Sequence, residues 1–183
     1  MEIYDLHSHI IPNLIGDDGS SDLDVSKQML EQAFASGTRH IVATPHVVDI
    51  GVCASWQEIK DNVAKLQEVA PSGLVIYPGT ELMLNWDLLK YYEEQGAYCL
   101  NGSRYALVEL PMLEGPKYTD NFFYEMQLMG LVPVLAHPER YGTVWDNPDR
   151  LLAWMKRACY CRLMLVVWWE ILARLFVKTP NFW

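Results

Sequence analysis

The sequence is poor in basic residues and in cysteines, and each shortage excludes a class of protein. Its 14 lysines and arginines are outnumbered by 23 aspartates and glutamates, which gives a formal net charge of -9. A nucleic-acid partner requires basic patches for its phosphates, so we expect no nucleic acid as the main partner. The four cysteines, Cys53, Cys99, Cys159 and Cys161, lack the spacing of a disulfide framework. With no signal peptide at the N-terminus, they predict a protein of the reducing cytoplasm.

Long apolar segments are missing as well. The most apolar stretch, residues 163–177, is about 15 residues long and contains Glu170 and Arg174. A helix needs roughly 20 apolar residues to cross a bilayer, so we predict no membrane span. The composition, with 51% hydrophobic and 20% charged residues, is that of a globular protein. A length of 183 residues favours a single domain, residues 1–183.

Short apolar segments alternate with amphipathic ones along the chain. We expect strands at residues 1–6, 40–44, 74–77, 105–108 and 132–136. We expect helices between Ser21 and Gly37 and at residues 56–69, 86–95, 120–129 and 147–158. Ser21 with Asp24, and Ser55 with Glu58, predict capping boxes at the starts of the first two helices. Strands that alternate with helices predict an α/β fold, with a parallel sheet covered by helices.

Each predicted strand is followed closely by a residue that can bind a metal ion. The carboxyl ends of parallel strands lie at one face, where enzymes of this architecture build their sites. The first strand leads into His7 and His9, which share a side because they are two residues apart. The later strands lead, in order, to His46, Glu81, Glu109 and His137. Such a mixture of imidazoles and carboxylates suits two or three divalent ions, such as Mn²⁺, Fe²⁺ or Zn²⁺.

Each of these residues also has an ordinary structural interpretation when it is taken alone. His46 could cap a turn, Glu81 could be a solvated loop carboxylate, and Glu109 could pair with a lysine. The acidic turn Asp17-Asp18-Gly19 could equally be a solvated loop. His40, at the start of its strand, is expected to be structural. The coincidence of all five strand ends is what favours a metal site.

Six short segments resemble, in the same order, the polymerase-and-histidinol-phosphatase (PHP) superfamily. Within it the sequence is most similar to the metal-dependent bacterial tyrosine phosphatases of capsule and exopolysaccharide synthesis. The matching segments are Asp5–Pro12, Asp17–Gly19, Ala43–His46, Pro78–Glu81, Leu107–Pro111 and Ala136–Tyr141. They lie within residues 1–161, and the His-Pro-Glu-Arg-Tyr segment that begins at His137 is specific to this branch.

The resemblance implies a distorted, TIM-like (β/α)7 barrel that binds two or three divalent ions, with Mn²⁺ favoured over Fe²⁺ or Zn²⁺. The implied metal ligands are His7, His9, Asp18, His46, Glu81, Glu109 and His137. Asp17 stays an alternative to Asp18, because the preceding loop is slightly longer than the family's usual one.

The resemblance also implies the reaction. The family hydrolyses phosphotyrosine in proteins, by attack of a metal-bound hydroxide on the phosphoryl group. Arg140 would be the catalytic and substrate-binding residue, since its planar fork of N–H donors fits two phosphate oxygens. The implied partner is a phosphotyrosine-bearing protein, specifically a bacterial tyrosine kinase that regulates polysaccharide synthesis. No Cys-x₅-Arg loop is present, so cysteine-phosphatase chemistry is excluded.

The C-terminal stretch departs from the family pattern. Family members continue to a Ser-Asp-Ala-His segment that completes the metal site, whereas residues 162–183 contain no Asp-x-His. We therefore expect an incomplete barrel with an atypical tail, in which residues 163–167 form a strand and residues 168–176 a helix. At least one metal position should be weak and the phosphatase activity low. Two alternatives stay open, a non-catalytic metal-binding remnant and a small-molecule phosphatase that acts on substrates like histidinol phosphate.

Overall fold

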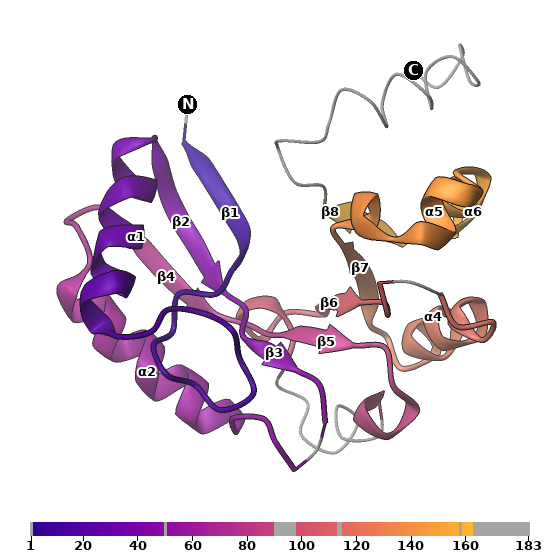
Figure 1. The fold of residues 1–183 in the computed structure, drawn as a ribbon, viewed down its shortest axis with the longest axis horizontal. Helices are drawn as coiled ribbons and strands as arrows, with labels where there is room; N and C mark the ends of the chain where they lie inside the picture. Colours follow the sequence, from indigo (N-terminus) through magenta and orange to yellow (C-terminus); the bar gives the residue numbers. More distant parts are fainter. Residues whose placement is uncertain (1, 50, 90–97, 113–114, 158, 163–183) are drawn as a thin grey trace.

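Two parallel sheets form the framework of the protein (Figure 1). The computed structural model describes residues 2–49, 51–89, 98–112, 115–157 and 159–162. The first sheet has the order β1-β2-β4 and contains β1 (Ile3–Ser8), β2 (Thr38–Ala43) and β4 (Val75–Pro78). The second has the order β3-β5-β6-β7-β8 and contains β3 (His46–Val47), β5 (Glu81–Met83), β6 (Tyr105–Glu109), β7 (Val132–Ala136) and β8 (Tyr160–Arg162). Every strand pair is parallel, as the sequence predicts.

Helices flank both sheets (Figure 1). They are α1 (Leu23–Ala35), α2 (Trp56–Val69), α4 (Thr119–Leu128), α5 (Gly142–Asp146) and α6 (Asp149–Lys156), with short 3-10 turns η1 (Leu100–Gly102) and η2 (Pro138–Arg140). In the first half of the chain α1 packs against β2, and α2 packs against β4. In the second half α4 packs against β7, and α6 packs against β8. This layering confirms the predicted α/β class.

The central strand β6 carries apolar residues because both of its faces are covered. In β6, Ala106, Leu107 and Val108 are all buried, although successive side chains point to opposite faces. Helix α2 supplies Ile59 and Leu66 to the same core. Full burial of each such aliphatic side chain contributes roughly 1.5 to 3 kcal/mol. Packing of this core fixes the positions of the strand ends. It therefore also fixes the positions of the polar residues that follow those ends.

The helix starts confirm one predicted cap and correct the other. The capping box of α2 is present: the Ser55 hydroxyl accepts from the Glu58 amide at 3.2 Å, and the Glu58 carboxylate accepts from the Ser55 amide at 2.8 Å. Helix α1 is capped by Asp22 rather than by Ser21, because the Asp22 carboxylate accepts from the amide of Val25 at 2.9 Å. The helix thus begins one residue later than the sequence pattern suggests.

Several sequence predictions stay untested. The described strands form two sheets, and their closure into a (β/α)7 barrel remains a prediction. Residues 86–89 are helical, while the rest of the helix predicted at 86–95 lies outside the described residues. The strand and helix predicted for residues 163–176 also lie outside them. Within the described ranges, no helix is both long and apolar enough to cross a membrane.

Candidate metal centre

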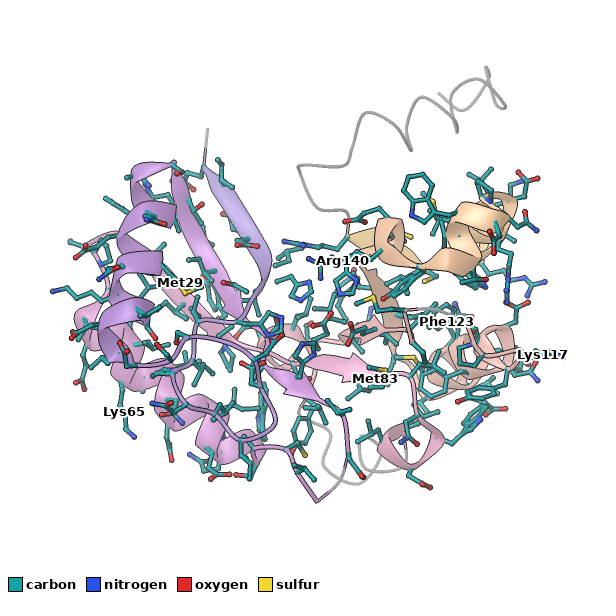
Figure 2. All side chains as sticks on the ribbon, in the orientation of Figure 1. Met29, Lys65, Met83, Lys117, Phe123 and Arg140 are labelled. Atoms are coloured by element: carbon teal, nitrogen blue, oxygen red, sulfur yellow. The ribbon has the colours of Figure 1, made fainter. Side chains whose placement is uncertain are left out.

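The residues predicted to bind metal converge on one cavity between the two sheets. All seven predicted ligands line this space of about 710 Å³. Arg140, which is labelled in Figure 2, lines it as well. His7 lies in β1, and His9 follows that strand. His46 and Glu81 come just after β2 and β4, where each begins a short strand of the second sheet. These short strands link the sheets and bring residues from both halves of the chain to one place.

Glu81 stands at the centre of four imidazoles. Its side chain is fully buried. Glu81 Oε2 lies 3.0 Å from His7 Nε2, 3.2 Å from His9 Nε2 and 3.2 Å from His46 Nδ1, and Glu81 Oε1 lies 2.9 Å from His137 Nε2. Burial alone would raise the pKa of Glu81, but the contacts with His137, His7 and His9 hold it well below its usual range. Glu81 is therefore a carboxylate at neutral pH.

Glu109 completes a carboxylate pair beside Glu81. Its Oε2 lies 3.5 Å from His46 Nδ1, and its Oε1 lies 3.6 Å from His137 Nε2. Burial and the neighbouring charge of Glu81 raise the pKa of Glu109. The two glutamates thus differ because Glu81 contacts several imidazoles closely, whereas burial dominates at Glu109.

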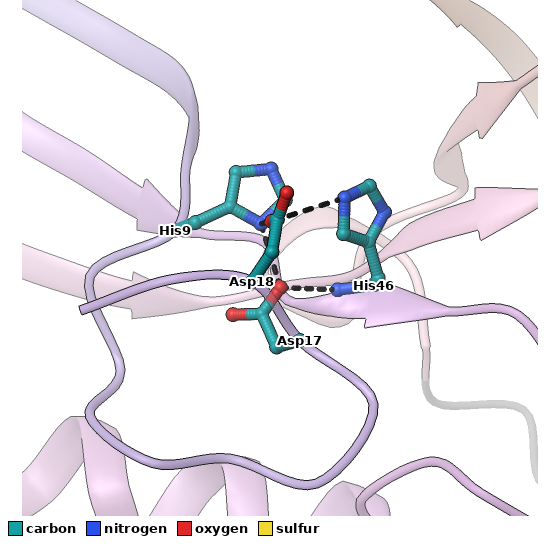
Figure 3. A group of neighbouring side chains, drawn as sticks. All are labelled: His9, Asp17, Asp18 and His46. Carbon is teal, nitrogen blue, oxygen red and sulfur yellow. Dashed lines mark hydrogen bonds and ion pairs between the residues drawn. The ribbon is translucent and has the colours of Figure 1, made fainter. Parts of the chain in front are cut away.

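Asp17 and Asp18 occupy different places beside His9 and His46 (Figure 3). Asp17 is buried, and its Oδ1 accepts from His9 Nδ1 at 2.8 Å and from the His46 amide at 3.1 Å. The Asp18 side chain is 83% exposed, with Oδ1 3.4 Å from His46 Nε2 and 3.9 Å from His9 Nδ1. Asp17 thus orients His9, while Asp18 presents its carboxylate to the cavity. The sequence could not assign these two roles.

The backbone has unusual features at two positions beside the cluster, Gly19 and His137. A Cβ at Gly19 would lie 2.7 Å from Asp17 Oδ2 and 2.7 Å from the His9 carbonyl oxygen, so only glycine fits the turn. His137 follows β7 with φ 28° and ψ 56°, in the left-handed region that is unfavourable for a non-glycine residue. Such local strain is characteristic of functional sites. In His137 it accompanies an imidazole that faces Glu81.

The pKa values of His7 and His9 are shifted in opposite directions. Burial lowers the pKa of His7 below its ordinary value. Burial also lowers the pKa of His9, but hydrogen bonds to Asp17 and Glu81 outweigh this effect and raise it to about 10. The metal-free cluster therefore binds a proton on His9, between two carboxylates.

The donor atoms fit divalent ions. Donors about 2.1 Å from a common ion stand about 3.0 to 3.4 Å apart, and the Glu81 Oε2 contacts fall in that range. Within the cluster, His7 Nδ1 and His137 Nδ1 are buried and have no hydrogen-bond partner among the described residues. Three groups have donors within 4.8 Å of one another: His9 with Asp17, Asp18 and His46; His7 with His9 and Glu81; and His46 with Glu81 and Glu109. These three groups, which share His9, His46 and Glu81, are the candidate metal positions.

Three further residues, His40, Arg140 and Arg162, differ in where they lie relative to the cavity. His40 lies away from the cavity, where it stacks on Tyr4 at 4.1 Å between ring centroids and contacts the Tyr77 hydroxyl at 3.1 Å; its predicted structural role is confirmed. Arg140 follows His137 in η2 and is exposed at the cavity. Arg162 at the end of β8 also lines the cavity and was not singled out.

An imidazole and carboxylate cluster at the ends of parallel strands, in a cavity that arginines also line, is a candidate metal centre of an α/β protein. The chain belongs to the capsular polysaccharide synthesis CpsB/CapC family, whose family model matches residues 3–164. This confirms the family to which the motifs of the sequence point.

Individual relatives agree with this assignment. The chain is 35% identical to the tyrosine-protein phosphatase YwqE of Bacillus subtilis over 153 residues, which cover 80% of this chain and 58% of YwqE. It is 31% identical to the tyrosine-protein phosphatase CpsB of Streptococcus pneumoniae over 162 residues, which cover 87% and 66% of the two chains.

A solved structure shows the same fold. The crystal structures of YwqE and CpsB are described as those of unique metal-dependent tyrosine phosphatases, and one of these chains matches with a TM-score of 0.78 at 28% identity. The match covers 88% of this chain and 66% of that one. The chain thus spans between 58% and 66% of the length of these relatives.

Proposed function

We propose that this protein is a metal-dependent phosphatase that hydrolyses phosphotyrosine in proteins. The observation that carries the proposal is the convergence of four histidines on the buried Glu81 carboxylate, inside a cavity that Arg140 also lines. The relatives named as tyrosine-protein phosphatases support the same reaction.

The residues have distinct roles in this proposal. His7, His9, Asp18, His46, Glu81, Glu109 and His137 would hold two or three divalent ions, for which we favour Mn²⁺. Such ions supply Lewis-acid charge and an activated water for attack at phosphorus. Asp17 keeps the His9 ring oriented through the Nδ1 hydrogen bond, so that Nε2 faces the cluster. Arg140 would bind two phosphate oxygens through its guanidinium fork.

The substrate we favour is a tyrosine kinase that regulates capsule or exopolysaccharide synthesis. The family's description as capsular polysaccharide synthesis proteins supports this choice. We place the protein in the cytoplasm, which the four free thiols support because disulfides are rare in reducing compartments. We also treat residues 1–183 as one domain. The contact of Arg162 with Asp5, at 3.4 Å, joins the far end of the described chain to β1.

Hydrolysis of defined phosphomonoesters tests the proposal. The full chain is loaded with Mn²⁺ and given a phosphotyrosine peptide, the matching phosphoserine peptide and histidinol phosphate. We expect metal-dependent release of phosphate, fastest from the phosphotyrosine peptide. Preference for histidinol phosphate would show a small-molecule phosphatase instead. Full metal loading without any hydrolysis would show a non-catalytic metal-binding protein.

A further inference from the structure

Arg162 lies at the end of β8, where the second sheet reaches the metal cavity. In the β7–β8 pairing Arg162 is opposite Ala136, the residue immediately before His137. Its side chain lines the same cavity as Arg140. The two arginines come from different segments, one after β7 and one on β8.

The guanidinium of Arg162 is only loosely held. Its Nη2 lies 3.4 Å from Asp5 Oδ1 and 3.4 Å from the His7 carbonyl oxygen, which are long distances for hydrogen bonds. No hydrogen bond from Nε or Nη1 is present within the described part of the chain. The side chain is 24% exposed. Several of the five N–H donors therefore remain available to a ligand in the cavity.

The negative charge in the cavity means that a cationic side chain would favour the binding of a phosphate. Three carboxylates line it, those of Asp18, Glu81 and Glu109, and the substrate phosphate itself carries about two negative charges. Among the described residues, the arginines and lysines that line the cavity are Arg140 and Arg162. An anion that enters would meet guanidinium groups only at these two positions.

We propose that Arg162 is a second phosphate-binding residue, which holds oxygens of the substrate phosphoryl group together with Arg140. This inference rests on the proposed function, because it assigns a role at the same centre. The competing interpretation is that Arg162 only ties β8 to β1 through Asp5. The two interpretations differ in a measurable way, since a tie between strands affects stability but does not affect the affinity for a free anion.

Binding of inorganic phosphate to the Mn²⁺-loaded full chain distinguishes the two interpretations of Arg162. Calorimetry measures the phosphate affinity, and the metal content and melting temperature are measured on the same samples. We expect Arg162→Gln to weaken phosphate binding by about tenfold or more, the size of a lost charge-assisted contact. Arg162→Lys should restore part of the affinity, because it keeps the charge and loses the fork. The Asp5→Asn variant should bind phosphate at least as tightly as the unmodified protein, because the guanidinium of Arg162 is still present.

Arg104→Gln is the matched control for charge. Arg104 is exposed, and it precedes β6 at the end of the sheet opposite to the cavity, so its loss should not change phosphate affinity. Unchanged phosphate affinity in Arg162→Gln at full metal content would overturn the inference, as would an unmodified protein that binds no phosphate. If phosphate binds through Arg162 but no phosphotyrosine is hydrolysed, the proposed function fails and the inference stands.

Discussion

Asp17 and Asp18 are neighbours in the sequence but lie in very different surroundings. The Asp17 side chain is 1% exposed and contacts His9, whereas that of Asp18 is 83% exposed. A buried carboxylate that orients a metal-binding imidazole typically contributes 10- to 100-fold, as an order of magnitude, to metal affinity. The positions of these two side chains follow from the turn at Gly19, which motif spacing alone does not reveal.

A pair of substitutions tests this difference. Asp17→Asn should lower the melting temperature of the metal-free protein, because it breaks a buried contact with protonated His9. Asp18→Asn should leave the melting temperature nearly unchanged, because the Asp18 side chain is exposed. It should weaken metal binding, because the carboxylate lies beside His46 at the cavity. Thermal melts and Mn²⁺ titrations of both variants provide the measurements. Equal melting temperatures for the two variants would contradict the assigned roles.

The protonation of His9 makes metal binding depend on pH. With a pKa of about 10, His9 is protonated in the metal-free protein at pH 7, and an imidazole must lose that proton before it can bind a metal ion. Metal binding at pH 7 should therefore release about one proton from this residue. The affinity for Mn²⁺ should rise as the pH increases from 7 towards 10. Calorimetry in buffers of different ionisation enthalpy measures the released protons, and a value near zero would contradict the raised pKa.

At the level of elements, the longer strands and helices were predictable and the shortest strands were not. The apolar runs of β2, β4, β6 and β7 are bounded by turn residues, so composition alone indicates them. Strands β3 and β5 contain two and three residues, and their pairing depends on neighbours distant in sequence. The candidate residues at the ends of the predicted strands meet in one cavity, as expected, and their roles as metal ligands remain a prediction.

Helix α2 offers a test of how a local cap supports the sheet. Ser55 caps this helix, whose Ile59 and Leu66 pack in the core. Ser55→Ala should destabilise the protein by about 1 kcal/mol, the usual effect of losing such a cap. Ser21→Ala is the control, because Asp22 caps α1 and Ser21 only donates to the Asp22 carboxylate on the surface. Urea unfolding measures both variants. An equal loss of stability would contradict the cap assignment.

At the level of the whole molecule, the site is assembled from distant parts of the chain. His7 lies in β1 of the first sheet and His137 follows β7 of the second, yet their ring centroids are 5.5 Å apart. Arg162 reaches Asp5, which is 157 positions away in sequence. The family motifs predicted that the ligands would meet, but a single sequence gives no distance between such positions. The role of Arg162 emerges only once β8 is placed beside β7.

The central claim is that the cluster around Glu81 binds divalent ions that support phosphate ester hydrolysis. Its most direct test measures bound Mn²⁺ by mass spectrometry and aryl phosphate hydrolysis on the same samples. The samples are the unmodified chain, Glu81→Gln and the surface control Glu31→Gln. We expect at least two bound ions and Mn²⁺-dependent hydrolysis for the unmodified chain and the control. We expect the loss of at least one ion and a fall in rate of about 100-fold for Glu81→Gln. Equal metal content and equal rates in Glu81→Gln and the unmodified chain would contradict the central claim.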